Sequence, residues 1–301
     1  MLWDRLNYGA PLVPKPTGID MPRHIACITF DFDAMSGMIA RGLTSATPIS
    51  RGEFGAAAVP RILALLKKYG VRTTWFVPGF TLETYPDQNR AVFQAGHEIA
   101  HHGWTHVPPN DMSAQEEEAG LVRANEQILK LTGQRARGYR SPSWDLSPHS
   151  IGFLLKHGFL YDTSMMGDDF TPYRARLGDV VDIQQPLKFG APTRLIEMPI
   201  SWTLDDFPHF EYLRTKTSLM PGLMNANLVL ENWINDWLYL KENSNWGILT
   251  YTFHPFVIGR GHRMMVLEKL IKRMADEGAV FMTMEDAARE YDARAPFVQP
   301  T

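Results

Sequence analysis

The sequence predicts a distorted β/α barrel of seven or eight units, in a single domain with long loop insertions. Short apolar runs alternate with helical patterns along most of the chain, the 301 residues suit one large domain, and 45% of them are hydrophobic. A doubly wound open sheet is the alternative arrangement of the same units. We expect an irregular N-terminal arm over 1–23, the barrel over 24–293 and a tail over 294–301.

The apolar runs that predict strands are short, and several end in polar residues. In chain order they cover 25–30, 72–77, 97–100, 136–140, 159–162, 194–200, 247–253 and 279–283. Strands that alternate with helices in this way form parallel sheets, because each connection must return the chain to the same end. The runs therefore predict a parallel sheet covered by helices.

Helical patterns lie between most of these runs. Apolar residues three and four positions apart predict a helix over 59–70. Ser113 and Glu116 have the spacing of a capping box at the start of a helix predicted over 113–133. Three further helices are predicted over 147–158, roughly 224–242, and 262–277.

Two irregular stretches, 34–56 and 164–192, are too long to be ordinary connections. Loops of this length are usually functional lids or subunit contacts. Together with the proline-rich arm they predict a covered pocket, closed by a neighbouring subunit. We therefore expect a homo-oligomer.

Composition excludes several function classes. The net charge is −3 and no Lys/Arg-rich run occurs, so nucleic acid is not expected as a partner. Cys27 is the single cysteine, which excludes an internal disulfide and a cysteine-based zinc site. No run of about 18 apolar residues occurs, so no membrane span is predicted. The N-terminus lacks the apolar core of a signal peptide. We expect a cytoplasmic protein with no membrane partner.

Polar, titratable residues follow the predicted strands repeatedly at the same end. In a β/α barrel the carboxyl ends of the strands form the active site. The residues at these ends are Asp31 and Asp33, then His101, His102 and His106, then Arg140 and Trp144, then Asp205 and Asp206, and finally His254. Their recurrence at one end predicts a catalytic site there.

One carboxylate and two imidazoles can hold a divalent metal ion and leave positions open for water and substrate. His102 and His106 are four positions apart, with Gly103 between them favouring a turn, and Asp33 would complete the triad. Asp31 lies two residues before Asp33, so its side chain points to the same side of the strand. It can then act as a general base toward a water whose pKa the ion lowers from ~15.7 toward ~7.

Four short motifs resemble those of the NodB-homology polysaccharide deacetylases, carbohydrate esterase family 4. They are HEIAHHGWTH, TFDFDA, YRSPSW and FHP, and the similarity spans roughly residues 25–290. The resemblance implies a distorted barrel and metal-dependent removal of an N-acetyl group. It implies that Asp33, His102 and His106 are metal ligands, with zinc expected first and cobalt, nickel or manganese as alternatives.

The resemblance also implies the catalytic roles of three residues. Asp31 would be the base, His254 the acid that protonates the leaving nitrogen, and Arg140 the residue that orients or tunes the base. Trp144, Asp205 and Asp206 are weaker candidates for substrate binding.

Two features resemble a particular subgroup of this family. Phe32 separates two aspartates that the family usually places side by side, and WTLDD follows the 194–200 run. This subgroup includes cyclic imide hydrolases, metal-independent allantoinases and intracellular peptidoglycan-deacetylase-like proteins. Two substrate classes therefore stay open: an N-acetylated amino sugar, or a small cyclic imide or ureide. In both, the bond is a non-peptide carbon–nitrogen bond.

Two further functions are compatible with the same residues. Non-haem iron oxygenases use a triad of two histidines and one carboxylate, although they usually sit on other folds. A non-catalytic carbohydrate-binding protein is the other alternative, but it leaves the base, the acid and the metal triad unexplained.

Overall fold

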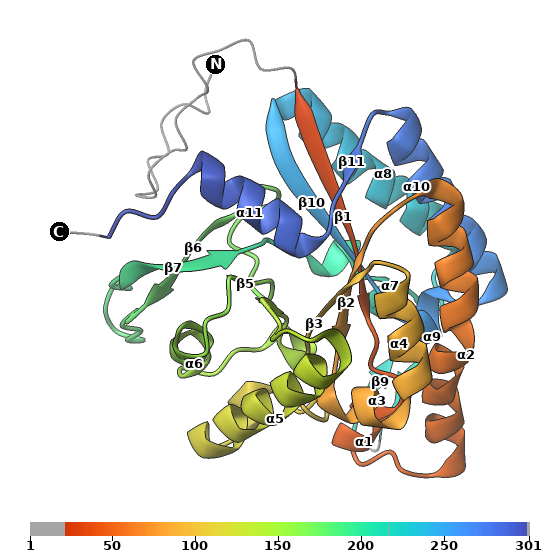
Figure 1. The fold of residues 1–301 in the computed structure, drawn as a ribbon, viewed down its shortest axis with the longest axis horizontal. Helices are drawn as coiled ribbons and strands as arrows, with labels where there is room; N and C mark the ends of the chain where they lie inside the picture. The colour runs from red at the N-terminus through yellow and green to blue at the C-terminus, as the bar shows by residue number, and fades with distance from the viewer. Residues whose placement is uncertain (1–21, 216, 300–301) are drawn as a thin grey trace.

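The computed structural model describes residues 22–215 and 217–299, which fold around one curled sheet (Figure 1). Residues 1–21 of the predicted arm lie outside the described residues, and Arg23 already begins the first strand. Among the described helices, none combines the length and the hydrophobicity that crossing a bilayer requires.

The sheet is a half-barrel of nine strands. Its order is β10-β1-β2-β3-β4-β5-β7-β6, with β11 pairing with β1. The strands are β1 (Arg23–Asp31), β2 (Thr74–Val77), β3 (Glu98–His101), β4 (Gly138–Tyr139), β5 (Tyr161–Asp162), β6 (Tyr173–Leu177), β7 (Ala191–Glu197), β10 (Trp246–Phe253) and β11 (Val280–Phe281). All pairs are parallel except β6 with β7. The predicted distorted barrel is thus confirmed, with one antiparallel strand at its edge.

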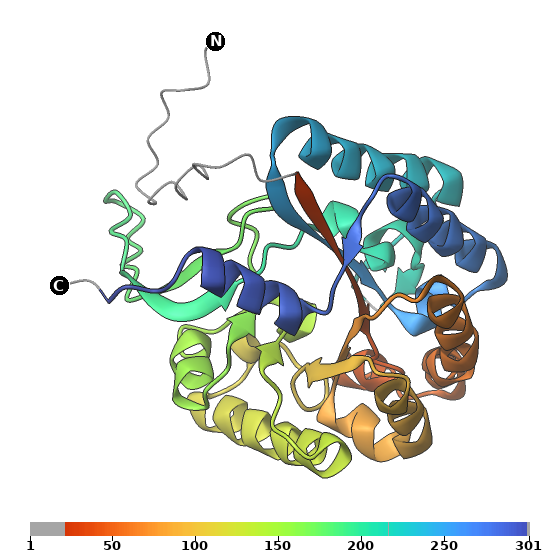
Figure 2. The ribbon, with the colours of Figure 1, turned by 45° about the horizontal axis from the view of Figure 1, so that its top comes forward.

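Helices surround the sheet, and Figure 2 shows most of them outside its curve. They are α1 (Ser36–Ala40), α2 (Ala46–Tyr69), α3 (Gly79–Thr84), α4 (Pro86–Gln94), α5 (Ala114–Thr132), α6 (Ser150–Lys156), α7 (Asp206–Phe210), α8 (Ala226–Asn243), α9 (Pro255–Ile258), α10 (Gly261–Asp276) and α11 (Met284–Arg294). Short 3₁₀ turns occupy Pro109–Asp111, Pro142–Trp144 and Trp202–Leu204. The capping box predicted for α5 is present at Ser113 and Glu116.

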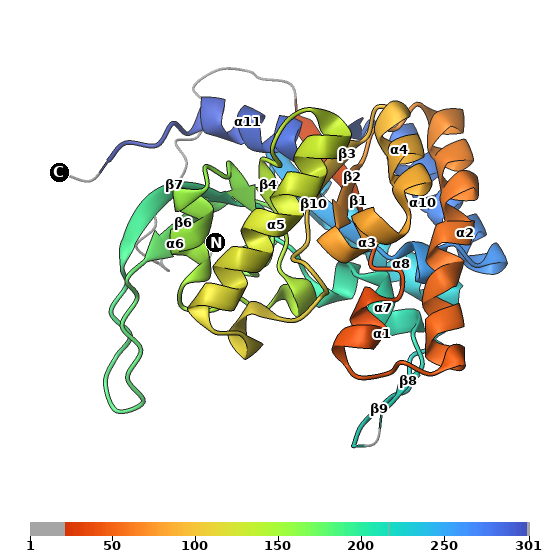
Figure 3. The same cartoon turned by 60° about the horizontal axis from the view of Figure 1, so that its bottom comes forward.

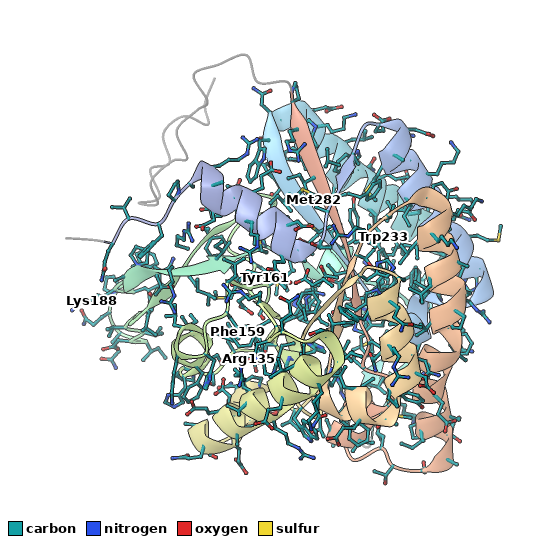
Figure 4. The ribbon with its side chains drawn as sticks, viewed as in Figure 1. Arg135, Phe159, Tyr161, Lys188, Trp233 and Met282 are labelled. Carbon is teal, nitrogen blue, oxygen red and sulfur yellow. The ribbon has the colours of Figure 1, made fainter. Side chains whose placement is uncertain are left out.

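β1 is an interior strand that lies between the edge strand β10 and β2. It pairs with β10 along its length, from Arg23 opposite Trp246 to Phe30 opposite Phe253, and with β2 on its other side. Its side chains are buried on both faces, as an interior parallel strand requires. Trp233 of α8, labelled in Figure 4, packs edge-on against Phe253 with 5.4 Å between ring centroids. This packing fixes the position of the residues that follow β1 and β10.

The stretch 34–56, predicted to be irregular, is mostly helical. It contains α1 and the first part of α2, which begins well before the predicted 59–70. Gly52, inside α2, is needed for close packing: a Cβ there would lie 2.5 Å from Met35 Cα. The glycine lets α2 lie directly against the chain that leaves β1.

The stretch 164–192 contains β6, which the sequence analysis missed because its side chains are only partly buried. The chain from β6 to β7 extends away from the body of the domain, and Lys188 in Figure 4 marks it. A second unpredicted hairpin joins β8 (Leu213–Arg214) to β9 (Leu219–Met220). Figure 3 shows this hairpin gathered with α1 and α7 at one end of the sheet.

Candidate active site

β1 carries Asp31 and Asp33 to its carboxyl end, as predicted. Both are buried, with 1% and 4% of their surface exposed. Phe32, between them, is fully buried and packs edge-on against Trp75, 6.0 Å between ring centroids. Because side chains alternate along a strand, Phe32 packs in the hydrophobic core while the carboxylates on either side of it face the end of the half-barrel.

The segment after β3 places His102 and His106 beside Asp33. Gly103 adopts φ +69°, a left-handed turn that glycine accepts without strain. His101 supports this turn, since Gly103 N–H donates to its Nδ1 at 3.1 Å and its Nε2 donates to the Leu121 carbonyl at 3.0 Å. His101, one of the residues at the predicted strand ends, is therefore a buried structural group.

The ligand atoms of the predicted triad converge. His102 Nε2 lies 3.3 Å from Asp33 Oδ1, and His106 Nε2 lies 3.4 Å from Asp33 Oδ2. His102 Nδ1 donates to the Arg140 carbonyl at 2.8 Å, which leaves Nε2 with its lone pair. Within the described residues, His102 Nε2 and Asp33 Oδ1 are buried and have no hydrogen-bond partner. Buried polar atoms left in this state are what a bound metal ion would satisfy.

The electrostatics of the triad favour a cation. Burial alone would raise the pKa of Asp33, but His106, His102 and His254 lower it below its usual range. Burial lowers the pKa of His106 to about 4, so its imidazole is neutral, as a metal ligand must be. Burial would also lower the pKa of His102, but Asp31 and Asp33 raise it. The carboxylates that favour a proton on His102 would equally favour a metal ion at that position.

Arg140 holds Asp31 in place. Its Nη1 donates to Asp31 Oδ1 at 2.6 Å and to Thr29 Oγ1 at 2.9 Å. The guanidinium is fully buried and lies 4.1 Å from the centre of the Phe76 ring. Asp31 Oδ2 is left facing the triad, 3.8 Å from His102 Nε2. The arrangement presents one carboxylate oxygen, held from behind, toward the place where a water would lie.

His254 follows β10 and faces Asp33 from the other side. Its Nδ1 lies 2.8 Å from Asp206 Oδ1, and its backbone N–H donates to the same carboxylate at 3.0 Å. Its Nε2 points to Asp33 Oδ2 at 3.7 Å. Burial would lower the pKa of His254, but Asp205, Asp206 and Asp33 raise it well above its usual value. Asp206, a candidate for substrate binding, therefore lies behind His254 and orients it.

A cavity of about 380 Å³ opens over these groups, and its lining includes Asp31, Asp33, His102, His106 and His254. Trp144 and Asp205, two of the candidates for substrate binding, also line it. Trp202, which the sequence analysis did not single out, stacks on Trp144 with 4.0 Å between ring centroids. The one signal for Trp202 was its place in the segment SWTLDD, which ends in the two aspartates.

The loops around the cavity are strained. Ala34, His106, Ser143 and Trp144 all adopt positive φ between 50° and 59°. Each such residue costs about 1–2 kcal/mol for a side chain other than glycine. Non-glycine residues held in this conformation cluster at functional sites, where the surrounding structure compensates for the strain.

Comparison with known proteins identifies the family. The family model "Polysaccharide deacetylase" matches residues 20–161. A peptidoglycan deacetylase of Helicobacter pylori is 36% identical over 282 residues, which cover 88% of this chain and 95% of that protein. The chain belongs to the polysaccharide deacetylase family. It is thus a deacetylase, a hydrolase of carbon–nitrogen bonds other than peptide bonds, and the predicted enzyme class is confirmed.

Two further comparisons place it within polysaccharide deacetylases. A peptidoglycan deacetylase-like protein of Gibberella zeae is 29% identical, covering 88% of this chain and 85% of that protein. A Mycobacterium smegmatis structure assigned to the polysaccharide deacetylases superposes with a TM-score of 0.82 and 28% identity, covering 97% and 98% of the two chains. An allantoinase superposes with a TM-score of 0.73 but only 21% identity, covering 97% and 100%, and so shares the fold.

A second buried carboxyl pair of this polysaccharide deacetylase lies outside the cavity. Asp162 of β5 and Glu197 of β7 are opposite each other in the strand register and fully buried. Asp162 Oδ2 and Glu197 Oε2 lack any hydrogen-bond partner in the described part of the chain. Burial raises the pKa of Asp162 to about 6, and burial together with Asp162 raises that of Glu197 well above its usual range. A proton shared by the two carboxyl groups would satisfy both free oxygens.

Glu197→Gln is expected to reduce the loss of stability between pH 5 and pH 8. In this pH range the folded protein keeps the shared proton, whereas the unfolded chain, with a carboxyl pKa of about 4, has already released it. The free energy of unfolding of the wild type therefore falls as pH rises. Glutamine can still accept the Ser164 and Met165 N–H groups and donate to Asp162. Thermal melting at each pH should show that the free energy of unfolding changes less with pH in the variant than in wild type, by at least ~1.4 kcal/mol across the range. Parallel profiles would rule out the shared proton.

Proposed function

We propose that this polysaccharide deacetylase removes N-acetyl groups from the amino sugars of peptidoglycan. The observation that carries the proposal is the convergence, over one cavity, of the Asp33, His102 and His106 ligand atoms with an oriented carboxylate and an oriented imidazole. The names of the Helicobacter pylori and Gibberella zeae relatives support peptidoglycan as the substrate. Cytoplasmic localisation and a homo-oligomer stay predictions.

The donor set fits a divalent metal ion. Asp33, His102 and His106 would hold it, since their ligand atoms lie within 4.8 Å of one another and two of them have no partner in the described residues. Two imidazoles and one carboxylate suit zinc, with cobalt, nickel and manganese as alternatives. When bound, the ion would polarise the acetyl carbonyl and stabilise the negative charge that develops on its oxygen.

Asp31 is proposed as the general base. Arg140 occupies its Oδ1, so Oδ2 is the oxygen that accepts a proton from the attacking water. As this proton leaves, the water oxygen forms a bond to the acetyl carbon. The Arg140 guanidinium keeps the carboxylate in one orientation during this step, which makes Arg140 a positioning residue.

His254 is proposed as the general acid. Asp206 takes the hydrogen of Nδ1, which directs Nε2 toward the cavity, and the raised pKa keeps Nε2 protonated near neutral pH. Nε2 donates its proton to the sugar nitrogen as the carbon–nitrogen bond breaks. The products leave as acetic acid, which keeps the second proton of the water, and the free amine; the two exchange this proton with solvent. The proton that Asp31 took from the water passes to His254, which returns both residues to their starting states.

The cavity walls suit a sugar ring. Trp144 and Trp202 form a stacked aromatic wall on one side, and Asp205 supplies a carboxylate for hydroxyl groups. A small cyclic imide or ureide is the second candidate, favoured by apolar lining from Met38, Met220 and Phe256. Attack on an imide carbonyl would use the same base and acid.

Acetate release tests the proposal directly. We expect the purified protein to release acetate from N-acetylated peptidoglycan fragments, and chelation to abolish this activity. Ring opening of a cyclic imide, followed by loss of ultraviolet absorbance, should be run in parallel. Ring opening without acetate release would replace the amino sugar with the imide as the substrate.

A further inference from the structure

Arg41 is a cation at the reaction site that the chemistry above does not use. Among the described residues that line the cavity, it is the only lysine or arginine. It directly follows α1, the short helix after Asp33, and Ser36 N–H donates to the Asp33 carbonyl at 3.0 Å. The backbone that carries Arg41 is therefore tied to the backbone of a proposed metal ligand.

The Arg41 side chain is held but not neutralised. Its Nη1 donates to the Gly37 carbonyl at 2.7 Å, which directs the guanidinium. No carboxylate oxygen of the described chain lies within 4.0 Å of it, and the residue is exposed to solvent. Arg140, by contrast, is buried against Asp31. One face of the Arg41 guanidinium remains available to a molecule in the cavity.

Gly37 brings this cation next to the metal triad. A Cβ built on Gly37 would lie 3.1 Å from Arg41 Nη1 and 3.6 Å from His106 Nδ1. The guanidinium and the His106 ring thus flank the same glycine. A group bound by Arg41 would be close to the acetyl group undergoing hydrolysis.

We propose that Arg41 binds a carboxylate that the substrate carries beside its N-acetyl group. A guanidinium matches a carboxylate with two parallel hydrogen bonds, and a neutral hydroxyl gains less from it. This inference rests on the proposed function. Among the amino sugars of peptidoglycan, a carboxylate contact at Arg41 selects N-acetylmuramic acid, which carries a lactyl ether with a carboxylate on the carbon next to the acetamido group. N-acetylglucosamine has only a hydroxyl at that carbon.

The test compares Arg41→Gln, Arg41→Lys and wild type on three substrates: N-acetylmuramic acid, its lactyl methyl ester and N-acetylglucosamine. We expect Arg41→Gln to raise KM for the free acid about 10-fold or more, with kcat little changed, and to leave the other two substrates unaffected. Arg41→Lys should recover part of the loss, since it keeps the charge but not the paired geometry.

Arg61→Gln is the matched control. Arg61 is also exposed and donates to a backbone carbonyl, that of Gly259 at 3.1 Å, but it does not line the cavity. It should behave as wild type on all three substrates. An equal loss on the acid, the ester and N-acetylglucosamine in Arg41→Gln would assign Arg41 a structural role and overturn the proposal.

A binding measurement separates this inference from the proposed function. Trp144 and Trp202 line the same cavity, so their fluorescence can report binding by chelator-treated protein that does not turn over. The free acid should bind more tightly than its methyl ester, and Arg41→Gln should remove the difference. That result supports the inference even if no sugar releases acetate, whereas equal affinities in wild type overturn it.

Discussion

Asp31→Asn is expected to lower kcat by ~10²-fold or more, the usual size of a general-base effect. Asparagine has nearly the same shape and can still accept the Arg140 hydrogen bond, but its amide cannot take a proton from water. Steady-state acetate release measures the loss, and the metal content of the purified variant should stay at the wild-type level. An unchanged kcat would exclude Asp31 as the base.

Asp162→Asn is a suitable control for Asp31→Asn. Asp162 is equally buried and ends β5 as Asp31 ends β1, but it does not line the cavity. It should keep wild-type kcat. The melting temperature of both variants must also be measured, because Asp31→Asn leaves the buried Arg140 charge without its carboxylate. A loss of kcat in folded Asp31→Asn alone would identify a chemical effect.

His106→Ala is expected to lose bound metal and to lower kcat/KM by about 10²–10³-fold, the range for removing one group that stabilises charge in the transition state. The imidazole supplies one of the three converging ligand atoms, and alanine supplies none. Metal analysis and acetate release should therefore fall together. Activity that persists in both chelated wild type and His106→Ala would show that the triad holds no catalytic metal.

His149→Ala is the matched control for His106→Ala. His149 is exposed and lies outside the cavity, so its loss should change neither metal content nor rate. Sugar binding by His106→Ala gives a further distinction. A binding protein would keep its affinity and show no turnover in wild type, whereas a hydrolase shows turnover in wild type that the variant loses.

The sheet and much of the site could be predicted from sequence because burial and chemistry constrain the same residues. A run of apolar residues ending in Asp31 and Asp33 has few explanations, since buried carboxylates need partners. His102 and His106, four positions apart, were the predicted partners of these carboxylates. The structure brings the two aspartates and the two histidines together. Parallel strands have their carboxyl ends at one edge, which made convergence predictable before any contact was known.

Other features depend on contacts that sequence does not display. Gly52 looks like a loop residue, but it lies inside α2 because only a glycine fits against Met35. Trp202 lines the cavity because it stacks on Trp144, from a part of the chain far away in sequence. Arg41 gave no signal beyond following Asp33 closely. These positions are set by tertiary packing, which overrides local pattern.

The pairing of β1 with β10 determines when the active site can exist during synthesis. Thr29 Oγ1 donates to the Tyr251 carbonyl, 222 positions later in the chain. Until the ribosome has released β10, one edge of the apolar strand β1 has no partner, although every proposed metal ligand has already been made. Unpaired apolar edges are the surfaces that join to other chains and aggregate. Residues 20–161, which match the family model, contain β1 but not its partner β10, so we expect productive folding to wait for the strand that also carries His254 into place.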